Sequence, residues 1–393
     1  MASRSLHPLV EQARAFANQV LRPRAGEFDA GYAVPADVIS AMADQGFLGS
    51  MLPVEYGGAG LDALSYGQLT AEIGKGCNSA RALLTVHTSL VGETLTRLGS
   101  PDQKLTWLPR LARGESIACF ALTEPETGSD ASAIRTTYQP VTDGYLLQGR
   151  KKWITYGAIA DLFLVFATCA GEMSAFLVER GIPGLSTHRI TGLLASRGAH
   201  LAEIELDNVR VPADALVGRL GAGFSFVANT ALFYGRYSIA WAGVAVAEAA
   251  LEEMASYARR REQFGKKLRM HQLVQALIAD AVAGVHSGRA LCERLAALRD
   301  AGDDDAINEA NIAKYVTSRL AVKISADAVQ VLGANGISER YPVERLYRES
   351  KVLEIIEGST QIQQMLIADF GIRRYRAPAT LRPPGTPPSK ESI

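Results

Sequence analysis

The sequence changes character twice along its length, from helical to β and back to helical, and this order constrains the fold more than any other feature. Up to about residue 114, apolar residues recur every three or four positions, as they do along one face of a helix. Between about residues 116 and 218, short apolar runs alternate with turn signals. Helical patterns return at about Phe224 and continue to Arg374. We therefore expect a mainly α-helical protein with a β insert.

The β insert contains a clear strand pattern near its end. Ala202, Ile204 and Leu206 alternate with two glutamates, which is the period of a strand with one buried face. Several such short segments within roughly 100 residues match the size of a small β-barrel or sandwich.

The last part of the chain contains several long helical patterns in series. Residues 240–261 are rich in Ala, Val, Leu and Glu, as a long helix prefers. Phe264-Gly265 interrupts this pattern, and a second helix follows with Val274, Ile278, Ala281, Val282 and Val285 on one face. The acidic loop AGDDDA, residues 301–306, then leads into another helix. Long helices in series predict a helical bundle.

These patterns divide the chain into four predicted segments. Residues 1–115 form an N-terminal helical domain, residues 116–222 a middle β domain, and residues 223–375 a C-terminal helical domain. Residues 376–393 form a proline-rich tail that cannot bury a core and is predicted to be disordered.

Composition excludes several classes of function. The 393 residues include 41 Lys and Arg against 41 Asp and Glu, so no overall field recruits nucleic acid or an anionic membrane. Four scattered cysteines and six dispersed histidines lack metal-ligand spacing, so we expect no metal site. The start of the chain lacks an apolar signal region, and no stretch reaches the roughly 20 apolar residues of a membrane span. We predict a cytoplasmic protein with buried, reduced thiols.

One candidate for chemistry lies in the stretch EIIEGSTQIQQ, residues 354–364. Thr360 and Gln363 form a capping-box pattern, which predicts a helix from about Gln361. Glu357 then lies on the preceding loop beside Gly358, which lets the backbone approach a ligand closely. Free amides at the helix start would point to the same place. The alternative is that Glu357 only complements the helix dipole from a solvated loop.

Three further stretches could contact a ligand, and each has an ordinary alternative. TEPETGSD, residues 123–130, could hold a phosphate or a heterocycle edge, or be a plain hairpin loop. Trp153 in WIT could stack on a planar ring, or belong to the core. RRREQFGKKLRMHQ, residues 259–272, carries six cationic side chains that could bind a pyrophosphate, or form a solvated face.

The order of these motifs is more informative than any one of them. ALTEPETGSD, WIT, RREQFGKKLRMHQ, AVQVLGANGI and IIEGSTQIQ follow one another along the chain. In this order the sequence resembles the acyl-CoA dehydrogenase family, over about residues 5 to 375. The resemblance implies an N-terminal helical domain, a middle β domain, a C-terminal four-helix bundle and non-covalently bound FAD. It also implies a homodimer or homotetramer in which a neighbouring subunit completes the cofactor site.

The resemblance also assigns expected roles to residues. Those that would line the flavin ring are Phe120, Leu122, Thr123, Ser129, Trp153 and Thr155. Those that would meet the FAD of the adjoining subunit are Arg261, Phe264, Gln272 and Gln330. Ser359 and Gln361 would close the site beside the base, and Arg236 and Gly358 would contact the substrate.

Glu357 matches the catalytic base of the family's most widespread pattern. The resemblance implies that it removes the α-proton of an acyl thioester while a hydride leaves the β-carbon for flavin N5. The thioester oxygen would accept hydrogen bonds from the Glu357 amide and an FAD ribityl hydroxyl. We expect an exposed carboxylate whose pKa rises when substrate excludes water. Electrons would pass to an electron-transfer flavoprotein or to oxygen.

Three departures from the family pattern bear on the substrate. Ile356 stands where fatty-acyl members often have tyrosine, Ala334 replaces a glycine, and Phe233 stands where CoA-specific members often have aspartate. YGRYSIAW together with RMHQLVQ is similar to dehydrogenases of polyketide and nonribosomal pathways, whose substrates are attached to an acyl carrier protein. We expect a short or hydroxylated acyl group on such a carrier, as in extender-unit biosynthesis.

Three alternatives stay open. The first is a short-chain acyl-CoA dehydrogenase of catabolism. The second is an oxidase or oxygenase on the same scaffold. The third, of another class, is a non-catalytic scaffold that binds carrier proteins.

Overall fold

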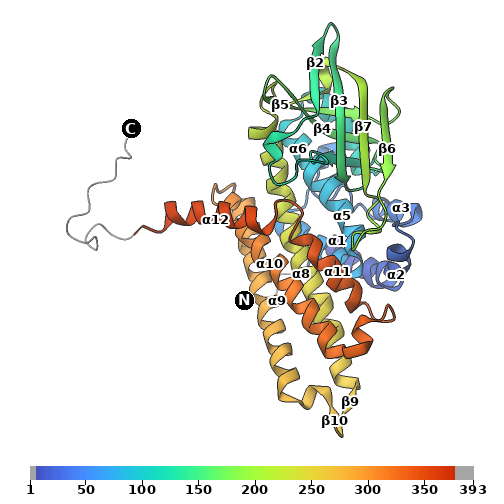
Figure 1. Cartoon of the computed structure of the whole chain (residues 1–393), viewed down its shortest axis with the longest axis vertical. Helices are drawn as coiled ribbons and strands as arrows, with labels where there is room; N and C mark the ends of the chain where they lie inside the picture. The colour runs from blue at the N-terminus through green and yellow to red at the C-terminus, as the bar shows by residue number, and fades with distance from the viewer. Residues whose placement is uncertain (1–5, 377–393) are drawn as a thin grey trace, which may run out of the picture.

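The computed structural model describes residues 6–376 and has three regions in chain order (Figure 1). Strands form one end of the molecule, long helices run side by side toward the other end, and the N-terminal helices pack where the two meet. The predicted fold class, mainly helical with a β domain between two helical parts, is confirmed. Of the predicted proline-rich tail, only Arg376 lies within the described residues.

The N-terminal region is helical throughout. Its α-helices are α1 (Pro8–Phe16), α2 (Arg22–Ala30), α3 (Ala36–Asp44), α4 (Ala63–Gly76), α5 (Asn78–Leu83), α6 (Thr94–Leu98) and α7 (Pro101–Ala112). A π-helical segment, Leu84–Glu93, joins α5 to α6. Polar caps set the helix starts: Ser100 and Gln103 form a capping box before α7. The largely buried helical stretch from Asn78 to Leu98 forms one wall of the candidate site.

The middle region contains one sheet of eight strands. The strands are β1 (Ala118–Ala121), β2 (Thr137–Val141), β3 (Gly144–Ile154), β4 (Leu162–Cys169), β5 (Glu172–Glu179), β6 (Leu185–Arg189), β7 (Ala202–Pro212) and β8 (Leu216–Val217). Their order is β6-β7-β3-β2-β4-β5-β8, and β1 pairs in parallel with β4. Ala202, Ile204 and Leu206 of β7 are buried, so the predicted alternation is confirmed.

The C-terminal region is a bundle of long helices. These are α8 (Asn229–Arg260), α9 (Gln272–Asp300), α10 (Ala306–Leu332) and α11 (Val343–Leu353), followed by α12 (Thr360–Arg374). A short hairpin of β9 (Glu262–Gln263) and β10 (Lys266–Lys267) joins α8 to α9. Phe264 and Gly265 form its turn, both with positive φ, which explains the predicted interruption. On α9, Ala281 and Val285 of the predicted apolar face are buried, whereas Val282 is 41% exposed.

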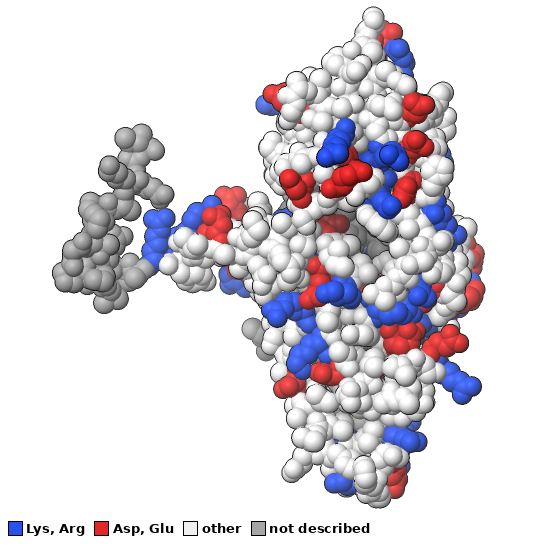
Figure 2. Space-filling model, viewed as in Figure 1, with Lys and Arg blue, Asp and Glu red and all other residues white. Residues whose placement is uncertain are grey.

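The surface carries both signs of charge. On the face in Figure 2, basic and acidic side chains alternate over both halves of the molecule, and the surface is hollowed between them. Within residues 6–376, no helix combines the length and the apolar character needed to cross a membrane.

Candidate functional site

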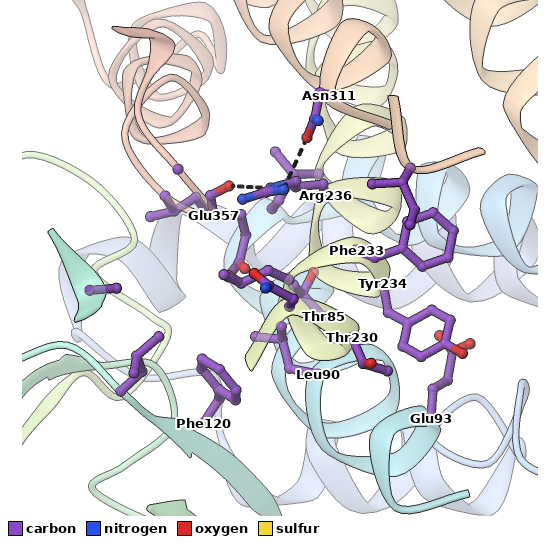
Figure 3. A pocket seen from close by; sticks show the side chains of 18 of the residues that line it. Thr85, Leu90, Glu93, Phe120, Thr230, Phe233, Tyr234, Arg236, Asn311 and Glu357 are labelled. Carbon is purple, nitrogen blue, oxygen red and sulfur yellow. Dashed lines mark hydrogen bonds between the residues drawn. The ribbon is translucent and has the colours of Figure 1, made fainter. Parts of the chain in front are cut away.

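A cleft of about 1560 Å³ lies where the three regions meet. The helix Asn78–Leu98, the sheet, α8 and the loop between α11 and α12 all contribute to its walls (Figure 3). The expected site residues that line it are Phe120, Leu122, Thr123, Ser129, Trp153, Thr155, Arg236, Glu357, Gly358 and Ser359. Residues more than 200 positions apart in the sequence thus share one cavity.

The loop that carries Glu357 has an unusual backbone. Glu357 adopts a left-handed φ of 55°, and Gly358 has a φ of 94°. Such a conformation is uncommon for a residue with a side chain and persists only where its surroundings hold it. Contacts with other parts of the molecule must therefore hold this loop in place.

The cap of α12 differs from the predicted one. The helix begins at Thr360, not at about Gln361, because Ser359 is the N-cap and its hydroxyl accepts a bond from the Ile362 amide at 3.4 Å. The Thr360 hydroxyl instead donates to the Glu354 carbonyl at 3.3 Å. Gln363 does not complete a capping box, because its side-chain amide donates to the Glu357 and Gly358 carbonyls at 3.2 and 3.3 Å.

Two cations from the bundle hold the same carbonyls. Arg236 on α8 donates from Nε to the Glu357 carbonyl at 3.2 Å and from Nη1 to Asn311 at 3.0 Å. Lys314 on α10 donates from Nζ to the Gly358 carbonyl at 2.7 Å. Figure 3 shows both Arg236 contacts. Charge-assisted bonds of this kind are stronger than neutral ones, so they account for the strained loop.

Glu357 is half-buried rather than exposed, which corrects the expectation from sequence. A Cβ built on Gly235 of α8 would lie 2.6 Å from Glu357 Oε2, so the glycine makes the space that the carboxylate occupies. Within the described residues Oε2 is buried and has no hydrogen-bond partner. Burial raises the pKa of Glu357 to about 7, against the opposing charges of Arg236, Lys314 and Arg81. A carboxylate with such a pKa can take a proton near neutral pH.

The backbone at Glu357 also offers a donor. Its carbonyl is engaged, but in the part of the chain that the structure describes its amide N–H donates to no acceptor. A free amide beside a half-buried carboxylate can polarise a carbonyl oxygen of a bound molecule.

On the sheet side, the loop after β1 is held by a buried ion pair. Lys151 Nζ lies 2.8 Å from Glu124 Oε1, and Glu124 also accepts the amides of Arg135 and Thr136 at 2.6 and 2.9 Å. Burial would raise the pKa of Glu124, but Lys151 and these donors hold it below its ordinary value. The segment predicted as a ligand loop or a plain hairpin is thus a fixed cleft wall.

Trp153 also lines this wall, and the amide of the preceding Lys152 donates to the Thr123 carbonyl at 2.9 Å. The φ of Trp153 is 63°, at the irregularity between Lys151 and Ile154 where β3 slips against β7, and its side chain is 48% exposed. The alternative that it is a core residue was therefore wrong. An exposed indole in a cleft is suited to stacking on a planar ring.

The other expected site residues lie elsewhere. Arg261, Phe264, Gln272, Gln330 and Gln361 do not line the cleft, and all five are exposed. The β9–β10 hairpin forms the far tip of the bundle (Figure 1), and Phe264 at its turn is 95% exposed. One copy of the chain therefore does not bring Arg261, Phe264, Gln272 or Gln330 into the cleft, and Gln361, at the first turn of α12, lies outside its lining.

Several residues of the site were not predicted. They are Arg81, Thr85, Gly235, Asn311 and Lys314, and only Gly235, a glycine inside a helix beside Arg236, had a local signal that could have found it. Among the described residues no group of three or more His, Cys, Asp or Glu could hold a metal ion.

Comparison with known proteins gives one family for most of the chain. Models of the N-terminal, middle and C-terminal domains of acyl-CoA dehydrogenases match residues 4–115, 119–209 and 221–372. The human mitochondrial short-chain specific acyl-CoA dehydrogenase is 37% identical over 94% of this chain and 90% of its own length.

Two solved structures extend the comparison. The prolyl acyl carrier protein oxidase AnaB superposes with a TM-score of 0.88 at 30% identity, covering 92% of this chain and 97% of its own. FkbI, described as acting in biosynthesis of the methoxymalonyl extender unit of the polyketide Fk520, has a TM-score of 0.85 at 32% identity, covering 92% and 99%.

Proposed function

Because the chain belongs to the acyl-CoA dehydrogenase family, whose members depend on FAD, we propose that it is an acyl-thioester dehydrogenase with Glu357 as its base. The observation that carries this proposal is the Glu357 carboxylate itself, which lines the cleft on a half-buried residue, with its Oε2 buried and unpartnered among the described residues and its pKa raised to about 7. A merely structural carboxylate would be paired or solvated.

The cleft wall on the sheet side fits a flavin. Trp153 exposes its ring there, Phe120 and Leu122 supply an apolar surface, and Thr123, Ser129 and Thr155 add hydroxyls for the edge of a heterocycle. We propose that these six residues hold the ring and that Ser359 lies at its margin.

The exposed hairpin residues would complete the cofactor site of another copy. The Arg261 guanidinium is suited to binding a pyrophosphate. Phe264, Gln272 and Gln330 are exposed near the same end of the bundle. We propose that all four contact the FAD of a neighbouring copy in a homodimer or homotetramer. Gln361 is exposed at the first turn of α12, and its role beside the base remains part of this proposal.

In the proposed mechanism the chain's residues bind, orient and deprotonate the thioester. The carbonyl oxygen accepts from the Glu357 amide, which makes the α-proton more acidic. Arg236 and Lys314 fix the loop through its carbonyls, and Glu357, beside Gly235, removes that proton. When bound, FAD supplies the hydride acceptor. Arg236 and Gly358 border the space left for the substrate.

For the acyl carrier, we propose a phosphopantetheine arm on an acyl carrier protein. Phe233, which stands where CoA-specific relatives often have aspartate, lines the cleft beside Tyr234, with ring centroids 5.3 Å apart. AnaB and FkbI, named for carrier-protein and extender-unit chemistry, support this choice. The greater identity to the short-chain acyl-CoA dehydrogenase supports CoA as the alternative carrier, with an electron-transfer flavoprotein as acceptor.

An anaerobic titration tests the proposal. The flavin absorbance of the purified holoenzyme is followed while short acyl-CoA thioesters, and then the same acyl groups on a carrier protein, are added. We expect bleaching with the carrier-bound thioesters and little with CoA thioesters. Bleaching with CoA thioesters alone would favour acyl-CoA catabolism, and a preparation that takes up no FAD would favour a non-catalytic scaffold.

A second measurement separates a dehydrogenase from an oxidase. After reduction, the holoenzyme is exposed to air and peroxide is quantified. We expect slow reoxidation and little peroxide, whereas stoichiometric peroxide would assign oxygen as the acceptor.

A further inference from the structure

The cleft extends past Glu357 in two directions along the helical stretch Asn78–Leu98. Leu90 marks the level of the base, because its Cδ2 would lie 2.7 Å from a Cβ on Gly235, the residue that packs against the Glu357 carboxylate. Residues before and after Leu90 on this stretch line the cleft as well. A bound thioester therefore has room on both sides of the base.

The two ends of the cleft differ in exposure. Before Leu90, the lining residues Thr85 and Val86 are buried. Beyond it, the lining residues Arg97 and Asn229 are exposed. A thioester beside the base must place its acyl group toward the closed end and its carrier arm toward the open end, because a carrier stays outside the cleft.

An ion pair lies on the open side of the base. Arg299, near the end of α9, donates from Nη2 to Glu93 Oε2, each side chain is only 7% exposed, and both residues line the cleft. The Arg299 guanidinium carbon lies 4.9 and 4.5 Å from the ring centroids of Tyr234 and Tyr237, which hold it in place. Figure 3 shows Glu93 beside Tyr234, on the other side of the pocket from Glu357.

This pair leaves one acceptor and one donor unused. Among the described residues, Glu93 Oε1 and Arg299 Nη1 are buried and have no hydrogen-bond partner. Buried polar atoms are normally paired, and a buried ion pair stabilises a fold only when its remaining atoms are satisfied. Burial raises the pKa of Glu93 to about 7, against the opposing charge of Arg299. A bound group that supplies both missing partners would remove this cost.

A secondary amide supplies both partners. Its carbonyl oxygen accepts from a guanidinium, and its N–H donates to a carboxylate. A phosphopantetheine arm carries such an amide two methylene groups from its sulfur, so at ordinary bond lengths the amide nitrogen lies about 5 Å from the thioester carbon. Glu93 is three residues past Leu90, roughly 4 Å further along the helix axis. The two lengths agree.

We propose that Glu93 Oε1 and Arg299 Nη1 bind the amide of the carrier arm nearest the thioester, and so set how far the acyl group enters the cleft. This inference rests on the proposed function, because it assumes that the thioester lies beside Glu357. The arm has the same chemistry on CoA and on a carrier protein. The other explanation is that the pair only ties α9 to the stretch Asn78–Leu98.

The test compares thioesters of one acyl group that differ only at this amide. The N-acetylcysteamine thioester contains the amide, and its O-acetyl analogue has an ester oxygen in place of the N–H. Kd is measured by isothermal titration calorimetry on the holoenzyme carrying Glu357→Gln, which cannot take the proton. We expect the amide to bind about tenfold or more tightly than the ester, because the ester turns a second acceptor toward Glu93 Oε1.

Removing both members of the pair tests their role without leaving a single buried charge. Glu93→Leu combined with Arg299→Met should fold, since apolar residues of similar volume commonly replace a buried ion pair at little cost, and should bind amide and ester equally. Glu248→Leu combined with Arg289→Met is the matched control. It removes another ion pair between α8 and α9 that does not line the cleft, and it should keep the preference for the amide.

Two results would overturn the inference. One is equal affinity for amide and ester before the pair is changed, which does not depend on how the double variant folds. The other is a preference for the amide that persists in Glu93→Leu with Arg299→Met, because a purely structural tie predicts that outcome.

A last comparison identifies the source of the arm and separates this inference from the proposed function. The same proteins are titrated with the thioester on CoA and on a carrier protein. The source whose affinity falls in the double variant is the one whose arm the pair binds, and a fall with neither would contradict the inference. A preference in Kd for the amide supports the subsite even if no thioester reduces the wild-type flavin, a combination that would contradict the proposed reaction alone.

Discussion

Glu357 Oε2 packs directly against the backbone of Gly235, where an added methyl group would lie only 2.6 Å away. Gly235→Ala should therefore displace the carboxylate and lower kcat by about 100-fold, the cost of a misplacement near 1 Å. The same methyl would lie 2.7 Å from Leu90 Cδ2, so this overpacking should outweigh the gain in helix propensity and lower the melting temperature. Flavin-reduction kinetics and thermal unfolding of the holoenzyme measure both.

Gly371→Ala is a matched control for this change. Gly371 is also helical, on α12, and a Cβ there would meet nothing within 4 Å. Its kcat should equal that of the wild type. If Gly235→Ala also left kcat unaltered, the added methyl group would not displace the Glu357 carboxylate, and this prediction would be wrong.

Replacing the base by its amide should separate chemistry from cofactor binding. Glu357→Gln is nearly isosteric and keeps the carbonyl contacts of the loop, but it cannot take a proton. We expect normal FAD content and a loss of at least about 100-fold in the rate of flavin reduction. A variant with near-normal rates would exclude Glu357 as the base.

The activity should depend on pH through Glu357. Its pKa is raised to about 7, so the base is protonated and inactive below that pH and becomes competent above it. The rate constant kcat/KM should thus rise with pH, with a midpoint near 7. A flat profile from pH 5.5 to 8 would contradict the raised pKa.

Lys314→Gln should move this midpoint to higher pH. Lys314 is among the cations that oppose the rise in the Glu357 pKa, and removing it leaves the carboxylate harder to ionise. Lys323→Gln, on the same helix but paired with Asp327 on the surface, should leave the midpoint unchanged. If the wild type and both variants had the same midpoint, the charge of Lys314 would not affect the pKa of Glu357.

The hairpin supplies a test of the cofactor site between copies. Arg261→Ala should lower the affinity for FAD by about tenfold or more, because a pyrophosphate would lose its charged partner. Arg260→Ala, the adjacent exposed arginine, is the control and should keep its FAD. The FAD affinity of each variant is measured by titrating its apoprotein with FAD. If Arg261→Ala bound FAD as tightly as the wild type and Arg260→Ala do, Arg261 would not belong to the cofactor site.

The local part of the site could be read from sequence because it depends on neighbours in the chain. The loop position of Glu357 beside Gly358 followed from the helix-start pattern that comes after it. The same reasoning placed the cap one residue too late, because Ser359 and Thr360 are chemically similar caps. In the structure the Thr360 hydroxyl donates to the Glu354 carbonyl, and Ser359 is the N-cap.

The sequence by itself determined the order of helical, β and helical regions, the strand face of β7 and the loop that carries Glu357. Periodicity and turn chemistry act over a few residues and therefore leave a visible pattern. Only the tertiary structure decided that Gly235 faces Glu357, that Lys314 holds Gly358, and that Arg81 reaches the same cleft. Such contacts join distant segments and are set by packing and desolvation, which leave no period in the sequence.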